Sequence, residues 1–567
     1  MQPIAYHGPR QCVNAPRGRR GGPSEELEKG EGVEDADVVV AGAGHNSLIT
    51  ACYLAKAGYR CLVLEANDRP GGGAVTEEVL LPGYAVDTCA TGHTLIRTNP
   101  VLAADELGIV AGGGLTYVDP DPVAHVGFPD GGHFTMSLDR EATVDEFGRY
   151  SAADARAYER LLDDYDGVKD VFAQAQHTPT GLGPSLDQLL AEHPRGRVWQ
   201  RRRMLSAWDV IRTEFESDQA RSFLMWMAFQ TNQALDVPGT GLLAYSIVFG
   251  RQQRSWSVLL GGSGRLVDAL VGYLESHGGE VRCGQPVARL LIEQGRCTGV
   301  ETESGERFAA RRAVVSTIHV TQLLDMAPPG SWPEELEYAV RTYDVGIPGF
   351  GVYCLSDVAP AFETAGGAVL AVSAGTVGWP DDVLRLGFDL RHGRFVTGVP
   401  WLLVATPTLV DPGRAPRGHH TVKVLSQQVY EVPGGPDAWP EAKEAHARRQ
   451  LDHLRRFAPG FTDDHILAMV VKAPPDFEAS NRHMVHGAFH GGDRGVAQSG
   501  PGRPAPGWAA HRMPIPGLYQ TGATTNPGGS VTGVPGRNAA RVVLSDLGHD
   551  PDSVLCGATA VAAPLGA

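Results

Sequence analysis

The chain has 567 residues, and its 65 acidic residues outnumber its 49 basic residues, which gives a formal net charge of −16. This charge argues against a nucleic-acid partner, because it would repel a phosphate backbone. The length exceeds that of one simple core and suits two interleaved domains. No run of about 18 apolar residues occurs, so the sequence predicts no membrane-spanning helix.

Residues 1–35 differ in composition from the rest of the chain. Basic residues gather at 17–20, glutamates follow within 25–35, and no apolar stretch of the signal-peptide kind accompanies them. We therefore expect residues 1–35 to be a disordered leader. The eight cysteines show no CxxC motif and no metal-ligand spacing, so we expect reduced thiols in a protein of the cytoplasm.

A nucleotide-binding pattern follows the leader. Residues 38–41 are an apolar run typical of a strand buried on both faces, and a helical pattern follows the turn at Gly42 and Gly44. Gly42 lets the chain turn, and Gly44 lets the backbone approach a pyrophosphate at the helix N-terminus. Ser47 replaces the third glycine of a GxGxxG motif, which is a helix-packing position.

A second apolar run ends in Glu65, about 20 residues beyond the glycines, where a carboxylate can accept hydrogen bonds from ribose hydroxyls. An acid there favours an unphosphorylated ribose, and so FAD or NAD rather than NADP. Gly71–Gly73 follow Arg69 and would allow a second backbone approach to a long dinucleotide, which favours FAD. Arg69 would neutralise phosphate charge. The alternative for this segment is a glycine-rich surface loop.

A matching glycine-rich segment lies near the other end of the chain, at residues 514–544. It contains Gly522–Ala523, Pro527–Gly529 and Gly533–Ala540. With the first motif, it resembles the phytoene desaturase-like FAD oxidoreductases, within the wider amine oxidase and carotenoid desaturase group. The resemblance runs from about residue 35 to residue 547.

The resemblance implies an α/β fold, with a discontinuous Rossmann-like FAD-binding domain of the glutathione-reductase type and an inserted α+β substrate domain. In this family, the C-terminal segment passes the flavin ring, and a helix N-terminus stabilises negative charge on it. The residue matching Val287 lays its backbone against the adenine, although sheet core is an alternative for Val287. The residues expected to bind FAD are Gly42, Gly44, His45, Asn46, Glu65, Arg69, Gly71, Gly72, Gly73, Val287, Gly522, Ala523, Gly529, Ser530, Val531 and Thr532.

The FAD-binding and substrate domains are expected to alternate along the chain. The predicted FAD-binding parts are residues 36–100, 255–320 and 512–548. The predicted substrate-domain parts are residues 101–254 and 321–511, and a tail follows at 549–567. Helical patterns occur at 154–171, 217–235 and 441–457, and a β pattern occurs at 422–429.

Few side chains suggest catalysis, which suits hydride transfer from a positioned substrate to a flavin. His483, His486 and His490 have spacings that metal sites also show. However, the segment around His490 resembles a family segment beside the flavin, so we expect no metal and treat His490 as a candidate catalytic residue. His93 is a second flavin-facing candidate, and a hydrogen-bonded core histidine is the alternative for it.

Residues 223–229 and 242–249 are unusually apolar and rich in adaptable side chains. They could be ordinary helix core. They could also wall a tunnel for a long hydrophobic substrate, or form a lip that rests on a membrane and makes the protein membrane-peripheral. The sequence leaves these alternatives open.

The sequence thus predicts an FAD-dependent oxidoreductase of desaturase or dehydrogenase type, acting by hydride transfer on an apolar polyene, isoprenoid or polyketide-derived small molecule. A composition rich in Arg, Ala and Gly suggests bacterial secondary metabolism, including antibiotic biosynthesis. The alternatives are a reductive cyclase of polyene tetramate macrolactam biosynthesis, an amine oxidase, and a flavin-free lipid-binding protein of the GDP-dissociation-inhibitor type. The direction of electron flow, the electron partner and the oligomeric state stay open.

Overall fold

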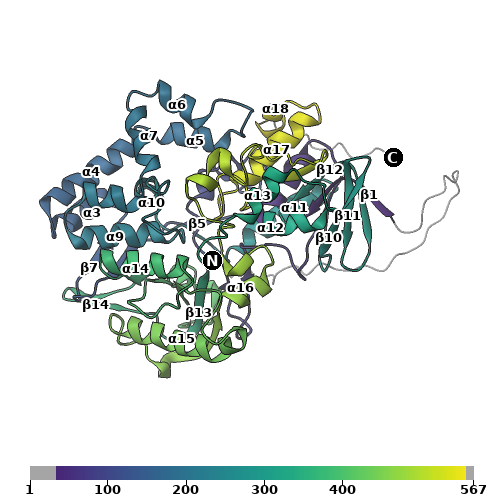
Figure 1. The fold of residues 1–567 in the computed structure, drawn as a ribbon. Coiled ribbons are helices and arrows are strands. Elements are labelled where there is room, and N and C mark those ends of the chain that lie inside the picture. The colour runs from purple at the N-terminus through teal and green to yellow at the C-terminus, as the bar shows by residue number, and fades with distance from the viewer. Residues whose placement is uncertain (1–32, 557–567) are drawn as a thin grey trace.

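The computed structural model describes residues 33–556, and it contains two large β-sheets with helices packed around them (Figure 1). Most of the predicted leader and the last residues of the predicted tail lie outside the described residues. The mixed α/β architecture confirms the predicted fold class.

The first sheet has the strand order β10-β11-β12-β1-β2-β9, and β20 pairs with β12. Strands β12, β1, β2, β9 and β20 are parallel along their pairings, whereas β10 and β11 form an antiparallel extension. The sheet therefore joins three distant segments of the chain, as the resemblance implies. The bounds are β1 Val33–Ala41, β2 Cys61–Leu64, β9 Glu280–Arg282, β10 Val287–Glu293, β11 Arg296–Thr302, β12 Arg307–Ser316 and β20 Leu518–Gln520.

Three helices share one core with this sheet: α1 (His45–Lys56), α11 (Gly264–Ser276) and α17 (Val534–Asp546). Leu48 and Leu54 of α1 are fully buried, because the helix lies between the sheet and the two other helices. The N-terminal motif and the C-terminal motif are thus packed against each other.

Regular secondary structure occurs within the segments predicted as leader and as tail. Strand β1 begins at Val33, inside the predicted leader, because its first residues pair with β12 from Arg307 onward. The predicted tail contains α18 (Pro551–Cys556), and Leu555 is fully buried in the core with α1. Both differences arise from tertiary pairing that local composition does not reveal.

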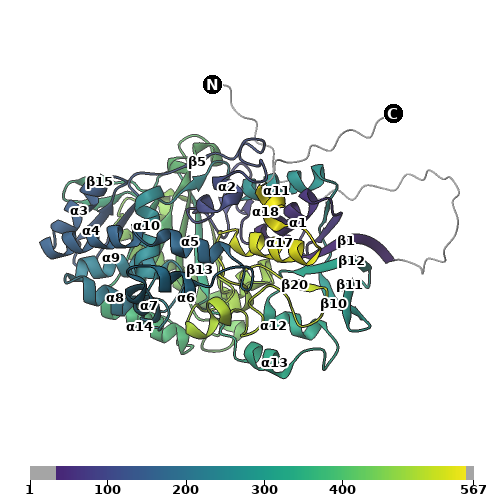
Figure 2. The same ribbon diagram turned by 90° about the horizontal axis from the view of Figure 1, so that it is seen from above.

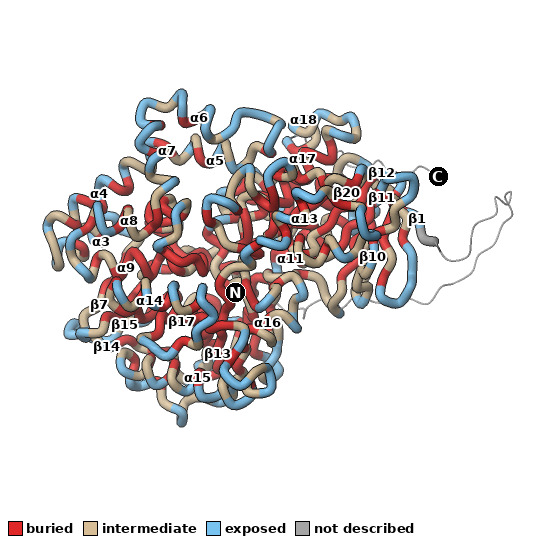
Figure 3. The backbone as a smooth tube through the Cα atoms, viewed as in Figure 1, coloured by how far each residue is buried: buried red, intermediate tan, exposed pale blue. Residues whose placement is uncertain are grey.

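The second sheet has the order β19-β13-β18-β17-β16-β6-β7 and is antiparallel except between β16 and β6. Figure 3 shows a buried interior that runs through both sheets and the helices around them. The bounds are β6 Ala124–Gly127, β7 His133–Met136, β13 Gly349–Ser356, β16 Ser373–Thr376, β17 Leu402–Ala405, β18 His420–Gln427 and β19 Ile466–Lys472.

Helices α3 to α10 gather beside the second sheet, away from β1 (Figure 1), and α5 reaches across to α17 (Figure 2). The side-chain amide of Asn538 on α17 donates to the carbonyl oxygen of Gln176 on α5 at 2.7 Å. The bounds are α3 Arg140–Gly148, α4 Ala152–Asp166, α5 Lys169–His177, α6 Leu186–Glu192, α7 Gly196–Met204, α8 Ala207–Glu214, α9 Asp218–Phe229, α10 Leu243–Arg254, α14 Pro380–Arg391 and α15 Trp439–Arg455.

The helical pattern predicted over 154–171 is divided between α4 and α5, because α4 ends at Asp166 and Gly167 caps it. The apolar run at 223–229 lies on α9 and is completely buried in the core, so helix core is the correct interpretation there. No helix among residues 33–556 is long and apolar enough to cross a membrane.

Six described cysteines are free, as expected, but Cys283 is disulfide-bonded. The expectation of reduced thiols is therefore wrong at Cys283.

Candidate functional site

A cavity of about 660 Å³ is lined by residues from both sheets. The ends of β1, β2 and β10 of the first sheet line it, and so do residues of β17 and β18 of the second sheet. Most of the predicted site residues line it: Gly42, Gly44, His45, Asn46, Glu65, Gly72, Gly73, Val287, His490, Gly522, Ala523, Gly529, Ser530 and Val531.

The turn between β1 and α1 is shaped for close approach by a ligand. Gly42 has φ +96°, and a Cβ there would lie 2.3 Å from the hydroxyl oxygen of Thr317. Gly44 has open space where a Cβ would be, and α1 starts directly after it with no side-chain cap and no acidic residue in its first turn. The free N–H groups of this helix end favour an anion such as a pyrophosphate.

Ser47 stabilises this turn as well as packing in the helix. It is fully buried, and its hydroxyl is within hydrogen-bond distance of the carbonyl oxygens of Gly42 and Gly44, at 2.6 and 2.9 Å. A glycine at this position could not make either bond.

Glu65 follows β2 and is 7% exposed. One carboxylate oxygen accepts from the backbone N–H of Ala43 at 2.8 Å, and the other accepts from Asn67 at 3.0 Å. Burial raises the pKa of Glu65 above its ordinary value, while these backbone hydrogen bonds lower it. The backbone N–H of Gln285 donates to the Glu65 carbonyl oxygen, which brings Val287 to the same end of the cavity.

The C-terminal segment reaches the cavity through Gly529, Ser530 and Val531. The N–H of Gly529 donates to the carbonyl oxygen of His490 at 3.1 Å. Helix α17 begins soon afterwards, at Val534, whose N–H donates to the Thr532 hydroxyl. The N–H of Gly536 donates to the side-chain oxygen of Asn46, which ties this helix to α1. A glycine-lined turn, a buried carboxylate and the uncapped end of α1 fit a long dinucleotide such as FAD.

Four predicted site residues do not line the cavity. Arg69 forms an ion pair with Glu77, so its charge is already balanced. Gly71 donates its N–H to the Ala43 carbonyl oxygen and holds the two glycine loops together. The carbonyl oxygen of Thr532 accepts from Asn99, and its side chain is turned to the start of α17.

His93 is the fourth of these residues, and the core interpretation of it is favoured. It is fully buried, and its two ring nitrogens lie 3.2 Å from the Tyr117 hydroxyl and 2.9 Å from the Ser263 hydroxyl. Burial lowers the pKa of His93 to about 4. Its neighbours in the chain line the cavity, but both of its nitrogens are already paired.

The histidines around His490 have separate surroundings. His490 lines the cavity, its Nδ1 is buried without a hydrogen-bond partner, and burial lowers its pKa to about 3. His483 has Nδ1 2.7 Å from the Thr317 carbonyl oxygen, whereas the ring of His486 packs on Tyr430. Within the described range 33–556, no group of three or more His, Cys, Asp or Glu residues is placed to hold a metal ion.

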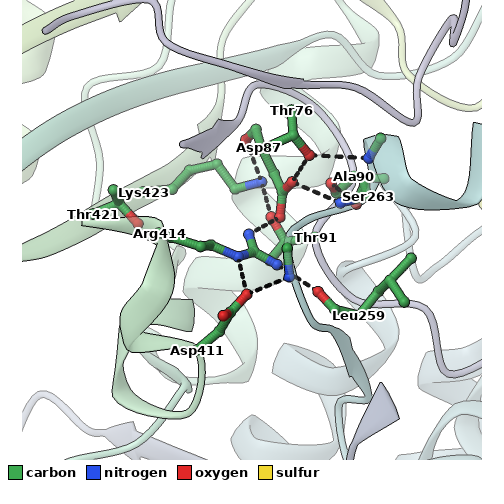
Figure 4. Close-up of polar contacts among 12 residues, drawn as sticks. Thr76, Asp87, Ala90, Thr91, Leu259, Ser263, Asp411, Arg414, Thr421 and Lys423 are labelled. Carbon is green, nitrogen blue, oxygen red and sulfur yellow. Dashed lines mark hydrogen bonds and ion pairs between the residues drawn. The ribbon is translucent and has the colours of Figure 1, made fainter. Parts of the chain in front are cut away.

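A buried network at the cavity contains Lys423, which the sequence did not single out (Figure 4). Its ammonium group donates to the carbonyl oxygens of Cys89 and Asp87 at 2.7 and 3.2 Å and to the Thr91 hydroxyl at 2.5 Å. Burial lowers the pKa of Lys423 to about 8. All three N–H groups are used, so Lys423 ties β18 to the loop that follows β4 (Val86–Asp87).

Arg414 completes this network. Its fully buried guanidinium pairs with Asp87 at 2.5 Å and with Asp411 at 2.7 Å. The other Asp87 oxygen accepts from Thr76 and from the backbone N–H of Ser263. The network therefore joins the two sheet-containing halves next to the cavity.

Two further cavity residues, Arg251 and Arg494, were also missed. Arg251 lies in the last turn of α10, and Arg494 follows the segment around His490. Neither belongs to a recognisable motif, and only the fold brings them together at one cavity.

The comparisons with known proteins agree with this geometry. The family model "Flavin containing amine oxidoreductase" matches residues 48–544. "Pyridine nucleotide-disulfide oxidoreductase domain-containing protein 2" of Mus musculus is 28% identical, over 90% of this chain and 94% of that protein. A component of the limonene dehydrogenase of Castellaniella defragrans is 26% identical, over 92% and 98%. "Phytoene desaturase (neurosporene-forming)" of Cereibacter sphaeroides is 25% identical, over 91% and 95%.

Solved structures show the same fold. Cyclohexylamine Oxidase from Brevibacterium oxydans superimposes with a TM-score of 0.56 at 17% identity, over 90% of this chain and 99% of that one. The family match and the desaturase relatives confirm the predicted resemblance, enzyme class and cofactor. The chain therefore belongs to the flavin-containing amine oxidoreductase family, as a carotenoid desaturase-like oxidoreductase that uses FAD.

Proposed function

We propose that this protein dehydrogenates an apolar small molecule of the polyene, isoprenoid or polyketide class. The observation that carries the proposal is a single cavity that is lined by Glu65, by Gly529–Val531 and by apolar side chains. FAD, when bound, would accept the hydride that the substrate loses. The proton lost from the neighbouring carbon would go to a weak base of the cavity wall, for which neutral His490 is placed, because its Nδ1 has no hydrogen-bond partner. The apolar side chains position the substrate and keep water away, and they include Leu95, Ile247, Trp256, Leu403, Leu425 and Phe489.

The side chains at the cavity support hydride transfer without a strong general base. Burial lowers the pKa values of His490, His45 and His483 to about 3, 4 and 4, so all three are neutral at pH 7. Lys423 has no free N–H to offer. The chain therefore contributes positioning, as a dehydrogenase of this kind requires.

The direction of the reaction is proposed to be oxidative, because the names of relatives include a dehydrogenase and a desaturase. An amine substrate is less suited to this cavity. Three acidic residues line the cavity: Glu65 follows β2, Glu303 follows β11 and Asp325 lies beside β10. The basic residues that line it are Arg251, Lys423, Arg482 and Arg494, and of these Arg482 is paired with Glu303. A cationic amine would therefore meet positive charge. Bacterial secondary metabolism, a cytoplasmic location and peripheral membrane contact stay predictions.

The test uses the purified protein and an extract of a host strain that lacks its gene. The absorbance spectrum reports bound FAD, and mass comparison after incubation reports the reaction. A product that has lost two hydrogens supports dehydrogenation, and a gain of two hydrogens supports the reductive cyclase instead. The Gly44→Val variant, in which a side chain fills the pyrophosphate approach, serves as the control without flavin.

A further inference from the structure

Two guanidinium groups line the cavity beyond the nucleotide end. Arg251 is 8% exposed, and the one hydrogen bond that its guanidinium makes among the described residues runs to the side-chain oxygen of Gln230 at 2.5 Å. Its guanidinium carbon lies 5.4 Å from the centre of the Trp256 ring. Arg494 donates to the carbonyl oxygen of Gly529 at 2.7 Å, and its Nε is buried without a partner.

The two guanidinium groups lie along one polar strip of the cavity wall. Gln230 accepts from Arg251, and the Gln230 backbone is close enough to His490 to raise its pKa. His490 in turn contacts Gly529, the residue to which Arg494 donates. The strip therefore lies beside the segment predicted to pass the flavin, whereas the uncapped end of α1 lies at Gly44.

Neither guanidinium has a carboxylate partner within the part of the chain that the structure describes. Buried arginines elsewhere do: Arg414 pairs with two aspartates, and Arg537 pairs with Glu106. Asp493, next to Arg494 in the chain, accepts from the Gly495 backbone and forms no ion pair with Arg494, although its negative charge raises the Arg494 pKa. Burial lowers the pKa of Arg251 to about 9 and that of Arg494 to about 10.

A buried charge without a counter-charge is unfavourable, so a chain retains one where a ligand supplies the opposite charge. A guanidinium presents several N–H groups in one plane and matches a carboxylate with two parallel hydrogen bonds. The lining around these two residues includes Trp256, Ile247 and Phe489, which suit an apolar skeleton.

We propose that Arg251 and Arg494 bind a carboxylate carried by an otherwise apolar substrate. This inference rests on the proposed function and deepens it, because the substrate becomes an acid of the polyene, isoprenoid or polyketide class rather than a neutral hydrocarbon. The carboxylate takes no part in the bond changes. It anchors one end of the molecule and so sets which carbon loses the hydride.

The experiment compares acids with alcohols that have the same skeleton. The FAD-loaded protein is titrated calorimetrically with dodecanoate and dodecanol, and with retinoate and retinol, so the natural substrate need not be identified first. We expect each acid to bind about 10- to 100-fold more tightly than its alcohol, which is the range for a hydrogen bond to a charged group. Equal binding, or no binding by either acid, would overturn the proposal.

Variants assign the preference to these residues. Arg251→Met and Arg494→Met should each remove most of the preference for the acid and leave alcohol binding unchanged. Arg254→Met is the matched control, because Arg254 lies on the same helix but is exposed. Without ligand, Arg251→Met should melt at the same temperature as wild type or higher, since it removes an unpaired buried charge.

Measuring the FAD content of each preparation shows whether a negative result refutes the proposed function or only the carboxylate proposal. A wild-type protein that holds no FAD would refute the proposed function. A wild-type protein that holds FAD but lacks the acid preference would refute only the carboxylate proposal. If either variant folds but loses FAD, the arginines serve the cofactor phosphates, and the carboxylate proposal is wrong.

Discussion

The backbone N–H of Gly529 donates to the carbonyl oxygen of His490, and a Cβ on Gly529 would lie 2.6 Å from the His490 Cα. Gly529 does not have a left-handed backbone angle, so space alone requires glycine here. This contact holds the C-terminal flavin segment against the segment that contains His490.

Gly529→Ala should reduce FAD occupancy and activity, because the added methyl group meets backbone atoms that cannot swing aside. Overpacking of this kind costs about 1–3 kcal/mol, and the larger Gly529→Val should abolish turnover. Gly272→Ala is the matched control, since nothing lies within 4 Å of that position. Flavin absorbance per protein and the anaerobic rate of flavin reduction measure both effects. Normal values for Gly529→Ala would show that the loop adapts.

Glu65→Ala should weaken FAD binding by about 1.5–3 kcal/mol, the range for hydrogen bonds to a charged group. The variant also loses the bonds from Ala43 and Asn67 that hold the glycine turn. Asp68→Ala, at an exposed position just after it, should leave the affinity unchanged. Flavin fluorescence titration of the apoprotein measures both variants, and unchanged affinity in Glu65→Ala would remove Glu65 from the site.

The rate of flavin reduction should not depend on pH between about 5 and 7. Burial lowers the pKa of His490 to about 3 and that of His45 to about 4, so neither histidine titrates in this range. His490→Ala should retain partial activity, with a loss within about 10²–10⁴-fold. Anaerobic stopped-flow measurements with the native substrate test both points. Complete loss of reduction with FAD and substrate still bound would require a general base at His490.

His93→Ala should destabilise the protein and leave the activity per bound flavin nearly unchanged. The substitution removes a partner from the Tyr117 hydroxyl, which costs about 1–3 kcal/mol if that group is left unsatisfied, whereas the Ser263 hydroxyl keeps its bond to the Ala90 carbonyl oxygen. Thermal unfolding reports the stability, and flavin reduction reports the activity. If the His93→Ala variant were stable but inactive, His93 would have to act in the active site, and the core interpretation would be wrong.

Lys423 should make the protein more stable as pH rises from about 8 towards 10. Its pKa is about 8 in the folded protein and 10.5 ordinarily, so within this window the unfolded chain binds the extra proton. The free energy of unfolding then rises with pH, by up to about 1.4 kcal/mol per pH unit from this group.

Lys423→Met should lose that pH-dependent contribution, whereas Lys443→Met, at a partly exposed pair with Asp476, should retain it. Urea unfolding of the three proteins across the window gives the comparison. A constant difference between wild type and Lys423→Met would contradict the assignment.

The sequence by itself determined the family, the cofactor and the class of fold. These conclusions depend on local patterns, because a turn that receives a pyrophosphate needs Gly42 and Gly44, and a ribose needs Glu65 at the end of the next strand. These residues lie within short stretches of the chain, so the motif can be recognised from the sequence without the structure.

Only the tertiary structure decided the roles of residues whose partners lie far along the chain. His93 is paired within the core, Arg69 is paired with Glu77, and Lys423 joins β18 to a loop more than 300 residues earlier. Arg251 and Arg494 line the same cavity, which forms only when both sheets assemble. Their chemistry follows from burial and from missing counter-charges, which are properties of the packed chain and leave no pattern in the sequence.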